Sequence, residues 1–163
     1  MALPFTLPWY WFIVHGTWAK VQEGGYVGEQ DDLQAIHKVY AAFGQGDVEG
    51  VISMLTDDVT WTTPGPPDVI PYAGERRGHD EVTGYFEAFG ASTETTAFEP
   101  QRFFADGDMV VVLGHYTFNV RSTGKVVDND FVHTFRLAEG KISAFEGYED
   151  SAAVVAAFSA GSN

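Results

Sequence analysis

The chain has 163 residues, of which 45% are hydrophobic and 15% aromatic, which predicts one packed domain and excludes a disordered chain. Nine Lys and Arg against 23 Asp and Glu give a net charge of −14, which argues against nucleic acid and anionic membrane surfaces as partners. The absence of cysteine excludes disulfides, thiolate metal sites and cysteine nucleophiles, and it is compatible with a cytoplasmic location.

Residues 1–28 form an apolar N-terminal arm. Its first 19 residues carry no charge, but Pro4 and Pro8 interrupt them. A signal peptide needs a positive start, and a membrane-spanning helix needs about 20 unbroken apolar residues. We therefore expect neither. The arm either packs on a neighbouring subunit or is an extension without a role, and a single domain covers residues 29–160.

Three helices are predicted in the first half of this domain. Apolar residues at spacings of three and four from Leu33 to Phe43 indicate an amphipathic helix that ends at Gly44 and Gly46. Asp47 can cap a short second helix that carries Val48 to Leu55. Val59 to Thr63 is typical of a strand, a loop is expected over 64–78, and a third helix follows around Val82 to Phe89.

The second half is predicted to be an antiparallel meander. Strands are expected over 98–104, 110–118, 126–135 and 141–148, and a short alanine-rich helix over 151–158 closes the chain. Helices that precede such a meander indicate an α+β domain in which the helices pack on one face of a curved sheet.

The hairpin formed by 110–118 and 126–135 carries the candidate site. If its tip is Ser122 to Gly124, strand alternation predicts that Leu113, His115 and Thr117 share one face with Asn129, Phe131 and His133. The opposite face would then carry Val110, Val112, Tyr116, Phe118, Val132 and Thr134. Two imidazoles on one apolar wall suggest a small-molecule pocket. The alternative is that each is a hydrogen-bonded core or interface histidine.

A metal site is not predicted. Asp130 lies near His133 in the sequence, but alternation sends it to the other face, and no His-x-His or HExxH spacing occurs. Phosphate-binding glycine loops and a nucleophile elbow are absent as well. We expect no cofactor.

Several segments resemble SnoaL-like proteins of the nuclear transport factor 2-like superfamily, which includes ketosteroid isomerases and limonene-epoxide hydrolases. The resemblance covers residues 30–158. It rests on these segments: Tyr40-Ala41-Ala42-Phe43-Gly44-Gln45-Gly46-Asp47, Leu55-Thr56-Asp57-Asp58-Val59-Thr60-Trp61, Tyr72-Ala73-Gly74 with Gly78, Phe135 to Ile142, and Tyr148-Glu149-Asp150. It implies a cone-shaped, mostly antiparallel sheet packed against three helices around an apolar pocket, usually in a homodimer joined through the sheet.

The isomerase residues do not carry over. The position of the general-base aspartate falls on Thr63. The position of the oxyanion-hole tyrosine falls on Val39, which is next to Tyr40. The position of the protonated oxyanion-hole aspartate falls on His133. Steroid isomerisation is therefore not expected. What the resemblance supports is that His133 faces the pocket.

The acids of the other family chemistries are missing too. One of the two aspartates that epoxide hydrolases need falls on Gly147. Polyketide cyclases use a single pocket acid, for which Glu146 is a faint candidate that an edge strand would leave in solvent.

Two function classes follow. In the first, the chain is a cofactor-independent isomerase, cyclase, lyase or hydrolase for an apolar carbonyl-bearing metabolite. His133 would carry the proton, with His115 as a second acid or base, and Asn129 and Tyr72 would orient the carbonyl. The apolar walls would come from Trp61, Phe86 and Phe131. In the alternative interpretation these are ordinary core residues, and Tyr72 is a loop residue whose hydroxyl lies in solvent. In the second class, the domain is a dimeric module that only binds a hydrophobic ligand.

A dimer is also expected from the hairpin itself. Its opposite face, with Val110, Val112, Tyr116, Phe118 and Val132, would leave a large exposed apolar patch in a monomer.

Overall fold

The protein, seen in a computed structural model, is described over residues 27–159. The N-terminal arm predicted over 1–28 lies almost entirely outside these residues. The elements follow in chain order: α2 (Val27–Gly44), α3 (Val48–Ser53), β1 (Leu55–Thr63), β2 (Gly74–Arg77), α4 (Gly78–Ser92), β3 (Thr93–Asp106), β4 (Met109–Val120), β5 (Val126–Ala138), β6 (Lys141–Glu149) and α5 (Ser151–Phe158).

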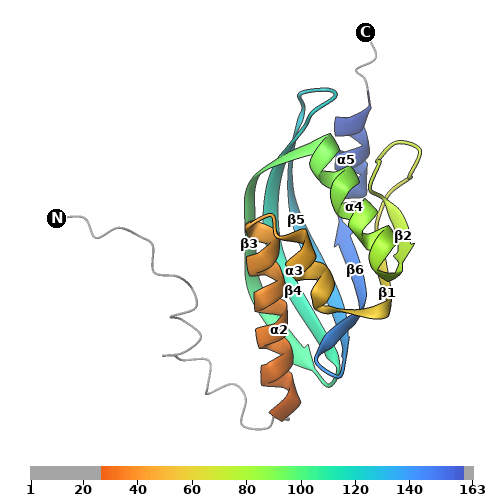
Figure 1. The fold of residues 1–163 in the computed structure, drawn as a ribbon. Helices are drawn as coiled ribbons and strands as arrows, with labels where there is room; N and C mark the ends of the chain where they lie inside the picture. The colour runs from red at the N-terminus through yellow and green to blue at the C-terminus, as the bar shows by residue number, and fades with distance from the viewer. Residues whose placement is uncertain (1–26, 160–163) are drawn as a thin grey trace, which may run out of the picture.

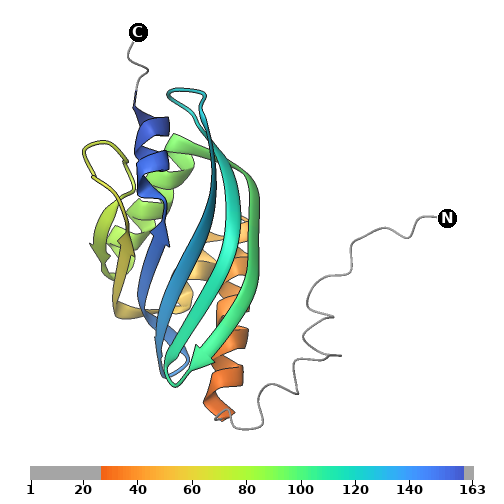
Figure 2. The same cartoon turned by 180° about the vertical axis from the view of Figure 1, so that it is seen from behind.

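One six-stranded sheet organises the described part of the chain. Its strand order is β2-β1-β6-β5-β4-β3, with β1 and β6 parallel and the other neighbours antiparallel. The sheet is strongly curved, and α2, α3 and α4 cover its concave side (Figure 1). From behind, the long strands β3, β4 and β5 present their convex side (Figure 2). The predicted α+β class, with three helices on one side of a curved and mostly antiparallel sheet, is confirmed.

The helix spacing of the sequence is realised in α2. Ile36 and Tyr40, which lie one helical turn apart, are both buried against the sheet. The helix begins at Val27, a few residues earlier than predicted, and the chain then turns at Gly46, whose φ of 70° favours glycine. Asp47 caps α3 by accepting a hydrogen bond from the Gly50 amide at 2.9 Å, as predicted.

Two local predictions were wrong. Leu55 was assigned to the short helix, but it begins β1, where its side chain is fully buried. The loop expected over 64–78 contains the edge strand β2, which pairs with the end of β1 from Thr63↔Gly74 to Thr60↔Arg77. The proline-rich segment therefore spans only the connection between these two strands.

The predicted register of the β4–β5 hairpin was also wrong, by one residue. His115 pairs with Asp130 and Val112 with His133. The last pair before the turn is Asn119↔Val126, so the connection between the strands, 120–125, contains an even number of residues. A turn centred on residue 123 would require a connection with an odd number of residues. Because side chains alternate, this slip exchanges the faces of one strand relative to the other.

As a result, the concave face carries residues that were predicted to lie outside. Val110, Val112, Tyr116 and Phe118 are all buried beneath the helices, and only Val132 and Thr134 of the predicted outer set face away from them. Gly114 lies opposite Phe131, and a Cβ atom at this position would collide with the Phe131 ring and the Glu99 carbonyl oxygen. The absence of a side chain at Gly114 is what admits that ring.

The closing helix α5 is fixed at both ends. Asp150 caps its first turn by accepting from the amides of Ala152 and Ala153. At its other end, Thr123 and Lys125 from the β4–β5 turn donate to carbonyl oxygens of α5. No helix in the described residues is long and apolar enough to cross a membrane.

Candidate functional site

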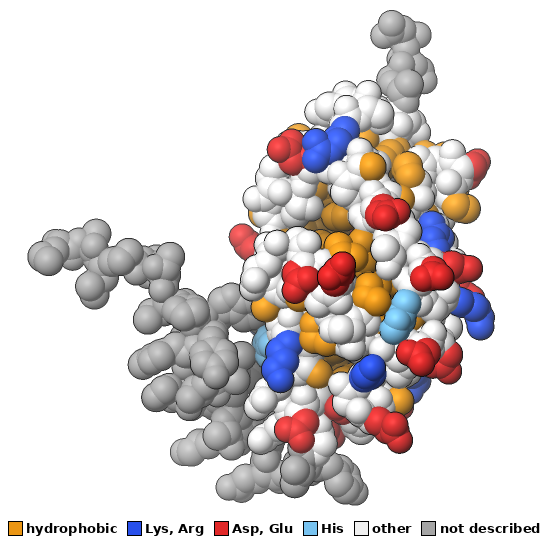
Figure 3. Space-filling model, in the orientation of Figure 1, with side chains coloured by type: hydrophobic (Ala, Val, Ile, Leu, Met, Phe, Trp, Pro, Cys, Tyr) orange, Lys and Arg blue, Asp and Glu red, His pale blue; other side chains and the backbone are white. Residues whose placement is uncertain are grey.

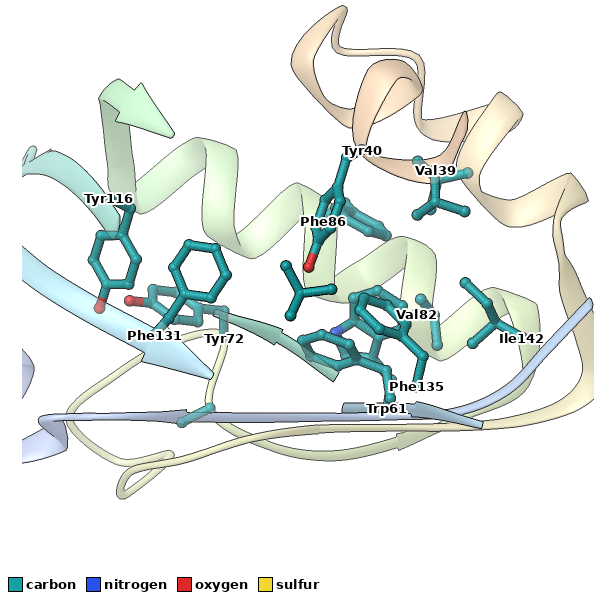
Figure 4. Close-up of a cluster of buried hydrophobic side chains, with 14 of the residues drawn as sticks. Val39, Tyr40, Trp61, Tyr72, Val82, Phe86, Tyr116, Phe131, Phe135 and Ile142 are labelled. Atoms are coloured by element: carbon teal, nitrogen blue, oxygen red, sulfur yellow. The ribbon is translucent and has the colours of Figure 1, made fainter. Parts of the chain in front are cut away.

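An aromatic cavity lies between the concave face of the sheet and helices α2 and α4. Its volume is about 80 Å³. Most of its walls are aromatic rings contributed by both the helices and the strands, and Figure 4 shows how several of them converge. Two polar groups, at His133 and Glu149, also open into this space.

Four of the seven predicted site residues line the cavity: His133, Trp61, Tyr72 and Phe86. Trp61 stacks on Phe145 with ring centroids 4.0 Å apart and packs against Phe86 at 5.5 Å. Both Trp61 and Tyr72 are almost fully buried, so Tyr72 is not the solvated loop residue of the alternative interpretation. Whether these four residues bind a ligand stays a prediction.

His133 forms a hydrogen bond with a tyrosine from α2. The Tyr40 hydroxyl lies 2.9 Å from His133 Nδ1, and the histidine tautomer decides which of the two donates. The Phe131 ring stacks on the imidazole at 4.1 Å. Although the cavity leaves part of the side chain accessible, protein surrounds the ring, and this desolvation lowers the pKa of His133 to about 3. The imidazole is therefore neutral at physiological pH.

A second polar group was not predicted. Glu149, at the end of β6, accepts a 2.5 Å hydrogen bond from the Tyr116 hydroxyl through Oε2. Asn129 Nδ2 in turn donates to the Tyr116 oxygen at 3.2 Å. Burial raises the pKa of the Glu149 carboxyl above its ordinary value, although the Tyr116 bond opposes the shift. The carboxyl is thus held in a fixed orientation and its ionised form is poorly solvated.

The two polar groups are close neighbours on one face. His133 pairs directly with Gly147, and Glu149 follows Gly147 by two residues on the same strand. Residues two apart in a strand point to the same side, and such diagonal neighbours are about 7–8 Å apart between Cα atoms. One small molecule can therefore reach both groups.

Further polar atoms of the wall lack well-formed hydrogen bonds within the described residues. These are Trp61 Nε1 and Thr63 Oγ1, which are both buried. They lie near the Tyr85 hydroxyl, whose pKa they lower slightly, but burial dominates and raises it to about 12. These atoms and the Tyr85 hydroxyl therefore form a small polar part of an otherwise apolar wall.

Asn129 and Phe131 lie behind the wall and do not line the cavity. The Asn129 amide is occupied by Tyr116 and by the Asp150 carbonyl oxygen, to which it donates at 3.1 Å. Phe131 packs between Phe98 and His133. Both residues thus support the wall: Asn129 lies opposite Tyr116 and Phe131 opposite Gly114. Their contacts with a ligand stay a prediction.

His115 lies on the opposite, convex face of the sheet, contrary to the prediction that it shares a wall with His133. Its Nδ1 is 2.8 Å from Asp130 and its Nε2 is 2.6 Å from Asp128. The hydrogen bond to Asp130 contributes most to raising the pKa of His115. The one-residue change of register explains this placement, and His115 cannot act on a ligand in the cavity.

The sequence contained partial signals for the missed residues. Phe145, Gly147 and Glu149 alternate along β6, so all three share the face that the resemblance assigns to the pocket. Tyr40 was recognised only as the neighbour of Val39. No spacing rule joins Tyr40 on α2 to His133, because the two are 93 positions apart.

Within residues 27–159, no group of three or more His, Asp or Glu side chains is arranged to bind a metal ion.

Comparisons with known proteins agree with this architecture. The SnoaL-like domain model matches residues 36–145. An uncharacterised protein of Mycobacterium tuberculosis strain H37Rv is 30% identical over 126 residues, which are 75% of this chain and 92% of that protein.

Two solved structures are similar over most of the domain. An NTF2-like protein from Burkholderia xenovorans LB400 superposes with a TM-score of 0.74 at 29% identity and covers 80% of this chain and 98% of its own. TerC, co-crystallised with polyporic acid, superposes with a TM-score of 0.68 at 26% identity, over 78% of this chain and 98% of its own. The chain therefore belongs to the SnoaL-like family of the nuclear transport factor 2-like superfamily.

Proposed function

We propose that the cavity binds an apolar, carbonyl-bearing small molecule and catalyses proton transfer at the carbon next to the carbonyl, without a cofactor. The observation that carries this proposal is that a neutral Tyr40–His133 pair and the desolvated Glu149 carboxyl line one apolar cavity. Tyr40 comes from α2, and His133 and Glu149 come from the neighbouring strands β5 and β6. The same chemistry serves isomerases, cyclases and lyases, between which the cavity does not discriminate. The co-crystallisation of TerC with polyporic acid supports a small organic ligand.

Glu149 is the group suited to accept the proton. Its carboxylate takes the proton from the C–H bond, whose electron pair forms a carbon–carbon double bond as the carbonyl becomes an enolate. The protonated Glu149 then returns the proton to a carbon of the same molecule. A raised pKa brings a carboxyl closer to the pH at which it can both accept and donate.

His133 and Tyr40 are suited to hold the oxygen of that enolate. His133 was predicted to carry the proton, but burial keeps its imidazole neutral, which favours a role as hydrogen-bond donor. A neutral imidazole or a phenol can instead donate a hydrogen bond to the developing negative charge, which is worth most in a site from which water is excluded.

The proposal is tested by deuterium exchange. The wild-type protein is expected to accelerate exchange of the C–H hydrogens beside the carbonyl of 2-tetralone in D₂O, followed by proton NMR. Glu149→Gln removes the proton acceptor and should slow the catalysed exchange by about 10²–10⁴-fold. Glu146→Gln is the matched control, because the Glu146 carboxyl lies on the same strand and faces away from the cavity. This variant should catalyse exchange at the wild-type rate.

Histidine variants separate the two possible roles of His133. If His133 donates a hydrogen bond, His133→Ala should lower the rate of catalysed exchange by about 10²–10³-fold. His133→Asn, which keeps a donor, should then retain more of this rate. If it carries the proton, both should lose equally. Exchange that is not faster than in buffer would leave the non-catalytic binding module as the function. Catalysed exchange that survives Glu149→Gln unchanged would rule out Glu149 as the proton acceptor.

We also propose a homodimer joined through the convex face of the sheet, in a cytoplasmic protein. The patch predicted from Val110, Val112, Tyr116 and Phe118 does not exist, because these residues are buried. A different apolar set supports the dimer: Leu113, Val132 and Tyr148 lie side by side across β4, β5 and β6, and Phe104 lies beside Val111 at the edge.

A further inference from the structure

The aromatic cavity is too small to hold a whole substrate. Its volume of about 80 Å³ is less than the roughly 150 Å³ of a protein cavity that accommodates benzene. Sites for small-molecule ligands usually measure about 300–1,000 Å³. A molecule that places its carbonyl between His133 and Glu149 must therefore extend beyond the cavity.

A much larger cleft adjoins it. This cleft, of about 740 Å³, lies between α2, the end of α4 and the first part of β3. Tyr40, Phe43, Phe86 and Phe98 line both spaces, so the cleft and the cavity adjoin at these aromatic side chains, which form a neck between them. Tyr40, which contacts His133, packs against Phe98 with ring centroids 5.4 Å apart, so the neck lies directly beside the carbonyl-binding pair.

Several small residues contribute to the walls of the cleft. Gly44 and Gly90 line it at the ends of their helices, and Ala41 and Ala97 face it from α2 and β3. A Cβ atom at Gly90 would meet nothing within 4 Å, so space and not backbone crowding surrounds this position. Glycine inside a helix is less stable than alanine, and here it widens an apolar cleft. Hydrophobic side chains line the furrow between the helices (Figure 3).

We propose that the substrate has a small carbonyl-bearing head and an apolar tail of several carbon atoms. The head occupies the cavity, the chain passes the neck at Tyr40 and Phe98, and the tail lies in the cleft beside Gly90. This inference rests on the proposed function for the identity of the head. The tail follows from the volumes of the two spaces and from the aromatic residues that line both of them.

The test compares two methyl ketones that share a head. Dissociation constants of 2-butanone and 2-decanone are measured by ligand-observed NMR on the full-length wild-type protein and two variants. Each buried CH₂ group contributes about fourfold in affinity when fully enclosed. We expect 2-decanone to bind at least tenfold more tightly than 2-butanone. Gly90→Leu, which places a side chain in the part of the cleft where the tail is proposed to lie, should reduce this advantage and leave 2-butanone binding unchanged.

Gly84→Leu is the matched control. Gly84 lies on the same helix, has no atom within 4 Å of an added Cβ, and lines neither space. It should bind both ketones as the wild type does. Because the assay measures binding, the result does not depend on whether the protein exchanges hydrogens of 2-tetralone.

Three outcomes would overturn the proposal. The first is that 2-decanone binds no more tightly than 2-butanone. The second is that Gly90→Leu weakens both ketones equally or neither. The third is that Gly90→Leu changes the sedimentation of the protein while the affinities stay constant, which would identify the cleft as a contact between copies of the chain.

Discussion

Glu149 and His133 show how burial sets the properties of single residues in this cavity. Both are desolvated, and in both cases burial favours the neutral form, which means a raised pKa for the carboxyl and a lowered pKa for the imidazole. Their effects on stability consequently have opposite dependence on pH. For His133, the free energy of unfolding decreases as the pH falls from about 6.5 toward 3. In this range the unfolded chain binds a proton at His133 and the folded protein does not.

Glu149 is expected to reduce stability at neutral pH. The unfolded chain releases this proton near pH 4.5, before the folded protein does, so the free energy of unfolding decreases as the pH rises through the raised pKa. Glu149→Gln, whose amide oxygen can still accept from Tyr116, should therefore be more stable than the wild type at pH 7. The difference should disappear below pH 4.5, where the carboxyl is protonated in both states.

Urea denaturation at several pH values measures this difference, with Glu146→Gln as the control for losing a carboxyl in solvent. A Glu149→Gln variant that is less stable than the wild type at pH 7 would contradict the assignment. A gain in stability together with a loss of exchange activity is the trade-off typical of a functional carboxyl.

At the scale of elements, the β4–β5 hairpin determines which side chains reach the cavity. Its register places Tyr116 opposite Asn129 and Gly114 opposite Phe131. The Phe131 ring, which supports His133, fills the space that a side chain at residue 114 would need. Position 114 thus couples strand pairing to the orientation of the imidazole.

Alanine substitutions at two glycines should therefore have opposite effects. Gly114→Ala should lower the free energy of unfolding by about 1–3 kcal/mol, because the methyl group overlaps the Phe131 ring and the Glu99 backbone. Gly84→Ala in α4 meets no neighbour and should raise it by about 0.5–1 kcal/mol, since alanine favours the helix. Thermal and chemical denaturation of both variants provide the comparison. Equal effects of the two substitutions would show that the hairpin is paired differently.

At the scale of the whole molecule, curvature separates two faces with different chemistry. The concave face holds the cavity and its desolvated polar groups. The convex face carries half-buried apolar residues in the centre of the sheet and the acid-flanked His115. A second copy is the partner that we expect on this face.

Sedimentation should therefore give the mass of a dimer at micromolar concentration. Val132→Glu places a charge in the centre of the convex face and should shift the protein to a monomer, since a buried unpaired charge is unfavourable. Ala138→Glu, at the exposed end of the same strand, should leave the dimer intact. A wild-type protein that sediments as a monomer at these concentrations rules out the assembly.

The sequence by itself determined the order of helices and strands and the face that each residue occupies within its own element. Apolar spacing located α2, α3 and α4, and alternation correctly joined Asn129, Phe131 and His133 on one side of β5. These patterns depend only on the geometry of one helix or one strand, so they can be read locally. The family resemblance added that His133 faces inward.

The tertiary structure alone decided how those faces meet. The length of the β4–β5 turn set the register that sent His115 outward and Tyr116 inward. Packing of α2 on the sheet brought Tyr40 to His133, and burial at the end of β6 desolvated the Glu149 carboxyl. Contacts between distant elements and the burial that shifts a pKa arise only when the whole chain is folded, because no local pattern specifies the solvent around a side chain.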